Sequence, residues 1–436
     1  MFKNIMNFLL TGSLFLAGLI SCKKDNGFSH NPGAPIKIDS FIPQTGGAAT
    51  EILISGGNFS ADSSGIRVTI NGHPLAIVGV NGHQVMAMVP KKCGSGHIVI
   101  YIGKDSITSD SVFTYRFTHT VSTLAGNGTA GFADGQGSNA MFSFNNPNWY
   151  RSMGVAVDNS LNVYVADVGN HCVRKIDSLG NVTTLAGNPN IAGHTDGKGS
   201  SATLGYPYDL TIDAAGNVYT VDPIQYDIRK ITPDGTISTL GWGQQGPWSV
   251  AVDNTTGFVY YSSCSSPGNV YQINTSGVTS QVISGLNYPA GLAFDVSGNL
   301  FAVIQGDQVV RKFAAGSWNA TTIAGQTGVG GYVNGPASQA LFSNPWGLAV
   351  DAAGNCYVAG NGTWDGGTEN PDQSIRYIEQ ATGNVSTFAG SGTSGYVDAI
   401  GGAAAFAGPG GVAVDKNGTV YVLDKNNNRI RKIVTE

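Results

Sequence analysis

Aromatic residues recur beside a repeated proline in this sequence. Tyr208, Trp248 and Trp346 each follow a proline directly, and Trp149 and Tyr150 lie just after another. Aromatic planes cover the apolar C–H face of a sugar, while carboxylates and amides bond its hydroxyl groups. This chemistry favours a carbohydrate site. The candidate ligand-binding residues are Trp149, Tyr150, Tyr208, Trp248, Trp346, Trp364, Asp167, Asp222 and Asp424.

A repeated segment must position these side chains. Its clearest copy, residues 409–433, reads PGGVAVDKNGTVYVLDKNNNRIRKI. A buried apolar strand, a Lys-Asn-Gly turn, a second strand and an alternating third strand follow one another in it. Six copies recur every 40 to 64 residues, which is the spacing of a propeller repeat with insertions. Their anchoring aspartates are Asp158, Asp213, Asp253, Asp295, Asp351 and Asp415.

A fourth strand follows most copies but not the last, because the sequence ends at Glu436. The stretch TVSTLAG at residues 120–126 matches the fourth strand of the first copy, residues 182–187. We therefore expect strand exchange between the two ends of residues 118–436, which closes six four-stranded blades into a ring and leaves no open sheet ends.

The pattern G-[VL]-A-V-D, G-N-V-Y-V-A-D and R-[IV]-R-K-I resembles the NHL repeat over residues 118–436, although the third copy lacks the Arg-Lys pair. The resemblance implies a β-propeller. In such a propeller, the start of each inner strand and the turn between the second and third strands share one face. The candidate residues would then gather around the mouth of the ring.

Residues 35–117 show short alternating strands separated by Gly and Asn turns, as in an immunoglobulin-like sandwich. The phrases ISGGNF, VTINGHPL and MVPKKCGSGHIVI resemble the IPT/TIG family. Domains of that family serve as spacers or interaction modules. The expected fold is thus all-β, a sandwich followed by a propeller.

The first residues read as a targeting segment. Lys3 precedes an apolar stretch, and Leu19-Ile20-Ser21-Cys22 resembles a bacterial lipobox. This implies a signal peptide over residues 1–21, lipidation of Cys22 and a polar tether to residue 34. The following Lys-Lys-Asp-Asn resembles lipoproteins of Bacteroidetes. We expect anchoring in the outer membrane, at the cell surface or on the periplasmic side.

The charge and the placement of potential metal ligands disfavour two classes of function, nucleic-acid binding and metal binding. The net charge is −5 and basic residues are dispersed, which disfavours a nucleic-acid partner. No Cys-x-x-Cys pair occurs, and the propeller histidines His119, His171 and His194 hold different repeat positions. We predict no metal or cofactor. Apart from Cys22, the cysteines are expected to be buried thiols.

Two further repeats are expected to be structural. Third-strand arginines recur in nearly every blade and should be ion-paired or hydrogen-bonded at blade boundaries. They are Arg174, Arg229, Arg311, Arg376 and Arg431. Four junctions between copies share a loop of the type GFADGQGSNAMF, with a short helical turn, in which Asp134 and Asp196 are turn formers.

The resulting prediction is a non-catalytic envelope lipoprotein whose propeller face binds a glycan or a protein of an outer-membrane uptake system. Two alternatives stay open. One is a metal-dependent propeller enzyme of the lyase or lactonase type, and the other is a protein–protein scaffold.

Overall fold

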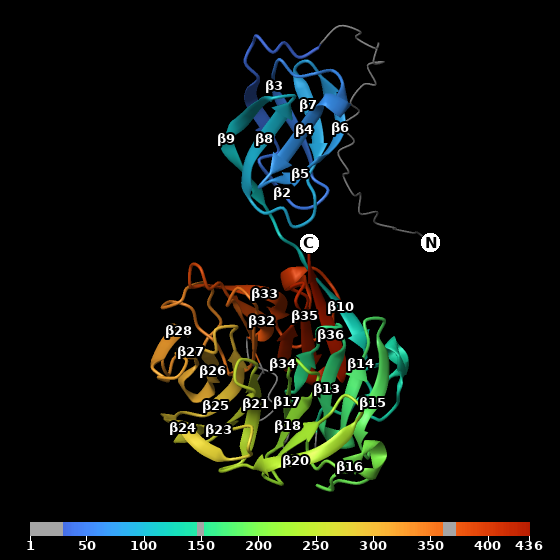
Figure 1. Cartoon of the computed structure of the whole chain (residues 1–436), viewed down its shortest axis with the longest axis vertical. Coiled ribbons are helices and arrows are strands. Elements are labelled where there is room, and N and C mark those ends of the chain that lie inside the picture. Colours follow the sequence, from blue (N-terminus) through green and yellow to red (C-terminus); the bar gives the residue numbers. More distant parts are fainter. Residues whose placement is uncertain (1–28, 146–151, 361–371) are drawn as a thin grey trace, which may run out of the picture. The chain divides into compact units, whose positions relative to one another are not determined.

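The protein was analysed as a computed structural model, which describes residues 29–145, 152–360 and 372–436. The chain divides into two compact units, one ending at Phe117 and the other spanning Thr118–Glu436 (Figure 1). The described residues contain strands and short 3₁₀ turns but no α-helix, so the expected all-β class is confirmed. In the same residues, no helix is long and apolar enough to cross a membrane.

Two sheets form the first unit. One has the order β1-β3-β7-β6 and the other β2-β9-β8-β4-β5. Side chains alternate between core and solvent along β8, and both sheets contribute to one buried cluster that includes Ile54, Val68 and Phe113. The strands are β1 Lys37–Ile42, β2 Thr45–Gly46, β3 Glu51–Gly57, β4 Ile66–Ile70, β5 His73–Pro74, β6 Ala76–Asn81, β7 Gln84–Met88, β8 Gly96–Ile102 and β9 Asp105–Tyr115.

The described residues of the second unit form six sheets, called blades 1 to 6 in chain order, and each has four main antiparallel strands. Blades 1 to 3 contain β12 Val155–Val157, β13 Val163–Asp167, β14 Cys172–Ile176, β15 Asn181–Gly187; β17 Asp209–Ile212, β18 Val218–Asp222, β19 Asp227–Ile231, β20 Thr236–Trp242; β21 Pro247–Asp253, β22 Phe258–Ser263, β23 Gly268–Ile273 and β24 Thr279–Leu286.

Blades 4 to 6 follow the same order, except that the outermost strand of blade 6 comes from the start of the unit. They contain β25 Pro289–Phe294, β26 Leu300–Ile304, β27 Val309–Phe313, β28 Ala320–Ala324; β30 Pro345–Val350, β31 Cys356–Gly360, β32 Gln373–Ile378, β33 Asn384–Gly392; β34 Pro409–Val414, β35 Val420–Asp424, β36 Arg429–Thr435 and β10 His119–Ala125.

The two ends of the second unit meet in blade 6. β10 pairs antiparallel with β36, with Val121 opposite Ile433 and Thr123 opposite Arg431. This is the strand exchange that the TVSTLAG stretch predicts. The inner strands contact one another in the order β12, β17, β21, β25, β30, β34 and back to β12, so the blades surround a common axis.

The repeated aspartates shape the turn after each inner strand. Asp415 Oδ1 accepts hydrogen bonds from the backbone of Asn417 and Thr419, and Oδ2 accepts one from the Tyr421 hydroxyl at 3.2 Å. The same pattern links Asp158, Asp213 and Asp351 to their own turns. These aspartates therefore cap the turns that follow the inner strands.

Candidate functional site

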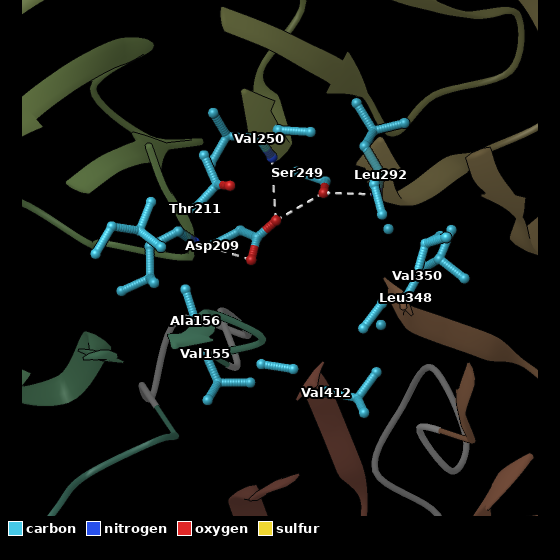
Figure 2. A pocket seen from close by; sticks show the side chains of 18 of the residues that line it. Val155, Ala156, Asp209, Thr211, Ser249, Val250, Leu292, Leu348, Val350 and Val412 are labelled. Atoms are coloured by element: carbon cyan, nitrogen blue, oxygen red, sulfur yellow. Dashed lines mark hydrogen bonds between the residues drawn. The ribbon is translucent and has the colours of Figure 1, made fainter. Parts of the chain in front are cut away.

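The inner strands enclose a central cavity of about 280 Å³. Residues of all six inner strands line it, and most are small and apolar, among them Ala156, Val250 and Val412 (Figure 2). Asp209 and Ser249 form a polar corner between the inner strands of blades 2 and 3. The repeat alone does not predict this corner, because the matching residue in the other four copies is glycine.

Asp209 is 7% exposed and has no basic partner among the described residues. Its Oδ2 accepts hydrogen bonds from Ser249 Oγ at 2.6 Å and from the Val250 backbone at 3.0 Å, and Oδ1 accepts one from the Leu210 backbone. Ser249 Oγ in turn accepts the Leu292 N–H at 3.0 Å. Burial raises the pKa of Asp209 to about 6, because its effect exceeds that of the hydrogen bonds, which lower the pKa. The pair connects the inner strands of blades 2, 3 and 4.

Glycine occupies the matching position in blades 1, 4, 5 and 6, and there the backbones of neighbouring inner strands touch. A Cβ on Gly411 would lie 1.9 Å from Met153 O, and one on Gly347 would lie 2.5 Å from Gly410 O. A side chain at either position would therefore push the inner strands apart. The remaining two glycines are Gly154 and Gly291.

The structure brings the predicted aromatics Tyr208, Trp248 and Trp346 together. Ring centroids are 4.9 Å apart for Tyr208 and Trp248, and 5.8 Å apart for Trp248 and Trp346. Trp346 Nε1 lies 3.0 Å from the sulfur of Met153. Tyr208 and Trp346 are only 2% and 3% exposed, whereas Trp248 is half-buried. Of the three rings, Trp248 therefore offers the most accessible surface, and the other two are packed inside.

Four further predicted residues, Trp149, Tyr150, Trp364 and the lipidation site Cys22, lie outside the described residues.

The predicted aspartates Asp167, Asp222 and Asp424 are enclosed. Asp167 and Asp424 are 0% exposed, and each is bonded to a buried arginine. Asp222 is 3% exposed and accepts backbone N–H groups of Tyr206, Ile224 and Gln225. The expectation that these carboxylates face a ligand on the rim is corrected here, because their oxygens already hold the chain in place.

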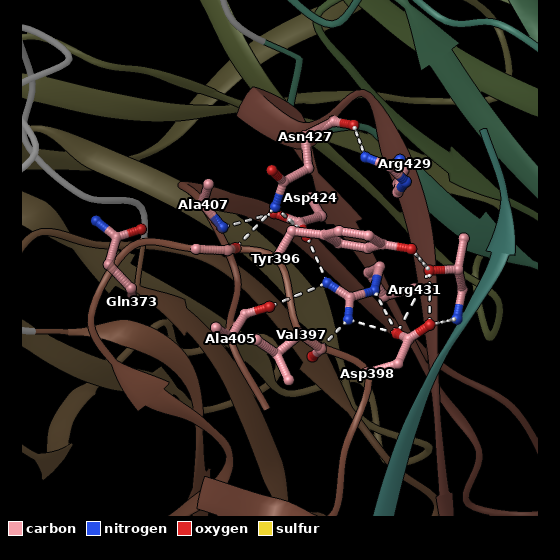
Figure 3. Close-up of polar contacts among 12 residues, drawn as sticks. Gln373, Tyr396, Val397, Asp398, Ala405, Ala407, Asp424, Asn427, Arg429 and Arg431 are labelled. Atoms are coloured by element: carbon pink, nitrogen blue, oxygen red, sulfur yellow. Dashed lines mark hydrogen bonds and ion pairs between the residues drawn. The ribbon is translucent and has the colours of Figure 1, made fainter. Parts of the chain in front are cut away.

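Arg431 shows how a carboxylate and an arginine hold a junction loop (Figure 3). The guanidinium lies 2.7 Å from Asp424 and 2.5 Å from Asp398, and it donates to the carbonyls of Ala405 and Val397. The rings of Tyr396 and Phe406 lie 4.8 and 5.1 Å from it. Asp398 and these loop groups come from the junction that precedes blade 6, so the buried cation anchors that loop to its blade.

The same clamp recurs in blades 1, 2 and 5. A buried arginine there bonds one carboxylate near its own strand and one Asp or Asn of the preceding loop. The sets are Arg174 with Asp167 and Asp134, Arg229 with Asp227 and Asp196, and Arg376 with Asp372 and Asn334. The predicted ion pairing is confirmed, and Asp134 and Asp196 are more than turn formers because each binds the arginine.

Blades 3 and 4 lack both the loop and the complete clamp. Blade 3 has Tyr271 at the arginine position, stacked on Tyr261 with centroids 5.1 Å apart. Blade 4 keeps Arg311, which bonds only Asp307 among the described carboxylates and is 23% exposed. The junctions before these blades are short, residues 243–246 and 287–288.

The sequence reasoning missed two exposed aromatics beside the first short junction. Trp242 is 55% exposed and Tyr226 is 47% exposed. The backbone N–H of Gly243 donates to Tyr226 O, and a Cβ on Gly246 would lie 3.9 Å from both the Tyr226 ring and Trp248 Nε1. We call Tyr226, Trp242 and Trp248 the junction aromatics. The unrepeated stretch GWGQQGP, residues 241–247, was the available signal.

The three histidines of the propeller lie in different environments and have different partners. His171 Nδ1 contacts the Gly205 carbonyl, the His119 ring lies tilted against Phe388 with centroids 3.9 Å apart, and the His194 ring lies 6.1 Å from the Trp242 ring. In the described part of the chain, no three His, Cys, Asp or Glu side chains converge as metal ligands. The four described cysteines are buried free thiols, as expected: Cys93, Cys172, Cys264 and Cys356.

Known protein families match segments of both units. The IPT/TIG domain matches residues 35–115, and the NHL repeat matches residues 154–176 and 406–433. The chain therefore carries a TIG domain and NHL repeats.

Curated relatives are distant. The chain is 27% identical over 317 residues to SUPPRESSOR OF QUENCHING 1 of Arabidopsis thaliana, covering 71% of this chain and 27% of that protein. It is 26% identical over 313 residues to human NHL repeat-containing protein 2, covering 66% and 39%. The chain thus matches well under half the length of either relative.

Solved structures from Bacteroides share the fold. A protein of unknown function from Bacteroides thetaiotaomicron matches with a TM-score of 0.62 and 20% identity, over 94% of this chain and 100% of that one. An auxiliary nutrient binding protein from the same organism matches with a TM-score of 0.56 and 21% identity, over 94% and 100%. At these identities the likeness establishes the fold alone.

Proposed function

We propose that this chain, with its TIG domain and NHL repeats, is an envelope lipoprotein that binds a nutrient glycan without transforming it, on the propeller face where the inner strands begin. The observation that carries the proposal is the group of junction aromatics, Tyr226, Trp242 and Trp248. Two are about half exposed and the third is half-buried beside the mouth of the ring.

The size of the aromatic contact decides how many rings the site needs. A ring that covers ~60 Å² of sugar contributes about 1.5 kcal/mol at ~25 cal/mol per Å². Micromolar affinity corresponds to about −8 kcal/mol, so one tryptophan is insufficient. Three rings with hydrogen bonds from exposed polar groups, such as Gln244 and His194, approach that value. The proposal also includes Trp149, Tyr150 and Trp364, which lie outside the described residues.

The other parts of the chain fit this role. Residues 1–21 would direct export, lipidated Cys22 would hold the protein in the outer membrane, and residues 22–34 would be a tether. Residues 35–117 would be a spacer domain and residues 118–436 the binding domain. The Bacteroides structures named auxiliary nutrient binding proteins support a binding role in uptake. A protein of the uptake system is the alternative ligand.

Titration of the full-length protein against a panel of polysaccharides tests the proposal. We expect one glycan class to bind at micromolar concentration, and Trp242→Ala and Trp248→Ala each to weaken it about tenfold. Phe117→Ala removes an exposed aromatic of the first unit and serves as the control, with unchanged affinity.

Three results contradict the proposal. Unchanged affinity in both tryptophan variants removes this surface as the site. Product formed from the glycan, or from lactones or uronides in a chelator-sensitive manner, makes the protein an enzyme. A stoichiometric envelope protein bound in the absence of any glycan affinity makes it a scaffold.

A further inference from the structure

The outermost strand of a propeller blade has a free edge, and four blades of this protein cover part of it with their junction loops. A two-residue strand pairs with the outermost strand in blades 1, 2 and 5, and Ile400 bridges to Thr120 in blade 6. The short strands are β11 Gly135–Gln136, β16 Gly197–Lys198 and β29 Gly335–Pro336.

The loops accept hydrogen bonds from backbone N–H groups of the outermost strands. In blade 6 the Val121 N–H donates to Ala399 O at 2.8 Å, and the Thr123 N–H donates to Asp398 Oδ2 at 3.1 Å. In blade 1 the Thr184 N–H donates to Asp134 Oδ2 at 3.3 Å. One loop carboxylate therefore bonds both the edge strand and the buried arginine behind it.

Blades 3 and 4 have no such cover in the described part of the chain. There β24 pairs only with β23, and β28 pairs only with β27. Thr322 lies opposite Arg311 in the register that places Thr184 opposite Arg174. The β28 sequence, Ala-Thr-Thr-Ile-Ala, has no charge or proline to discourage strand pairing, and its first three residues are exposed.

Blade 4 also retains the arginine that holds a loop elsewhere. Arg311 Nη2 lies 2.8 Å from Asp307, its carboxylate in the same blade. In blades 1, 2 and 6 a second, loop-derived carboxylate completes the clamp, and in blade 5 an asparagine does so. Because the 287–288 junction is too short to supply this group, the guanidinium and the β28 edge form an incomplete copy of the loop site.

We propose that the edge of β28 binds an extended segment of a partner protein that carries Asp or Asn followed by Gly or Ala. The segment would pair with β28 by strand addition while its carboxylate or amide bonds Arg311 and the Thr322 N–H. The four loops of this chain define that occupant, since they read Asp134-Gly135, Asp196-Gly197, Asn334-Gly335 and Asp398-Ala399. This site is independent of the proposed glycan surface.

A peptide copy of a junction loop tests the proposal with a known probe. The peptide is residues 129–142, TAGFADGQGSNAMF, labelled with a fluorophore and titrated against the full-length protein by anisotropy. We expect saturable binding that weakens about tenfold or more with Arg311→Gln or Thr322→Pro in the protein, or with the Asp134→Ala change in the peptide. The Asp134→Asn peptide should still bind, because Asn334 fills this role in blade 5.

Gln281→Pro is the matched protein control, because Gln281 lies opposite Tyr271 in blade 3 at the register position of Thr322. It should leave binding unchanged. If Thr322→Pro fails to fold, Arg311→Gln combined with the Asp134→Ala peptide carries the test, since the two changes should not add.

Three outcomes overturn the proposal. The first is no saturable binding up to millimolar peptide. The second is binding that is insensitive to Arg311→Gln and to the peptide carboxylate. The third is a concentration-dependent dimer of the protein that Thr322→Pro disrupts, because a second copy would then be the occupant of this edge.

Discussion

Two kinds of junction join the blades of this propeller, and they hold neighbouring blades together by different means. Loop-bearing junctions precede blades 1, 2, 5 and 6, and short junctions precede blades 3 and 4. At the loop-bearing junctions a buried arginine clamps the loop, and inner strands touch through a glycine such as Gly411. At the short junctions the clamp is incomplete, and Asp209 and Ser249 bridge the inner strands instead.

This difference shows which parts of the ring are accessible to ligands. A loop-bearing junction uses its polar groups internally, so Asp167 and Asp424 are unavailable to ligands. The short junctions leave Trp242, Tyr226 and the β28 edge exposed. Both binding proposals therefore concern the part of the ring that the loops do not cover.

The largest expected effect comes from removing a clamp arginine. Arg431→Gln leaves Asp424 fully buried without its cation, so we expect the free energy of unfolding to fall by about 3–5 kcal/mol. Arg311→Gln, at a short junction with a partly exposed pair, should cost about 1 kcal/mol or less. Urea denaturation of both variants measures the difference. Equal losses would mean that the loop adds nothing to the clamp.

Adding a methyl group where two inner strands touch at a loop-bearing junction should lower the free energy of unfolding nearly as much. Gly411→Ala places a Cβ 1.9 Å from Met153 O, and because this neighbour is backbone, we expect a loss of about 3 kcal/mol. Ser249→Gly at a short junction is the reverse change and removes the hydroxyl that bonds Asp209, with a loss of about 1–2 kcal/mol. A milder effect for Gly411→Ala than for Ser249→Gly would contradict the close-contact account.

The bridge at the short junctions should make stability depend on pH. The pKa of Asp209 is raised to about 6, so the folded state favours the protonated acid. The stabilisation of the folded state by protonated Asp209 is fully present below pH ~4. It is lost as the pH rises through about 6, which lowers the free energy of unfolding by roughly 2–3 kcal/mol. Asp209→Asn should abolish this part of the pH dependence between pH 4 and 7. An identical pH profile in the variant would show that Asp209 does not titrate in this range.

The smallest effect concerns the loop half of a clamp. Asp398 is 38% exposed, and Asp398→Ala removes its bonds to Arg431 and the Thr123 N–H. We expect a loss of about 1–2 kcal/mol. Asp398→Asn should cost less than about 0.5 kcal/mol, because blade 5 uses Asn334 in the same way. Thermal melting of the two variants measures the difference. Equal losses of stability for Asp398→Asn and Asp398→Ala would contradict the role of this residue in binding Arg431.

Repetition explains which features the sequence predicts. The blade strands, the turn-capping aspartates, the paired arginines and the β10–β36 pairing all follow from residues that recur in register. The accessibility of the candidate site does not follow, because Tyr208 and Trp346 pack into the ring while Trp248 stays half-buried. Trp242 and Tyr226 were missed because they border an unrepeated junction, where no period reveals the exposed face.

Amide hydrogen exchange along the outermost strands tests most directly the claim that loops cover four blade edges and leave two open. We expect slow exchange at Val121, Thr123 and Thr184, whose N–H groups bond loop oxygens, and fast exchange at Ala320, Thr322 and Gln281. Equal protection at the two sets of amides would contradict it.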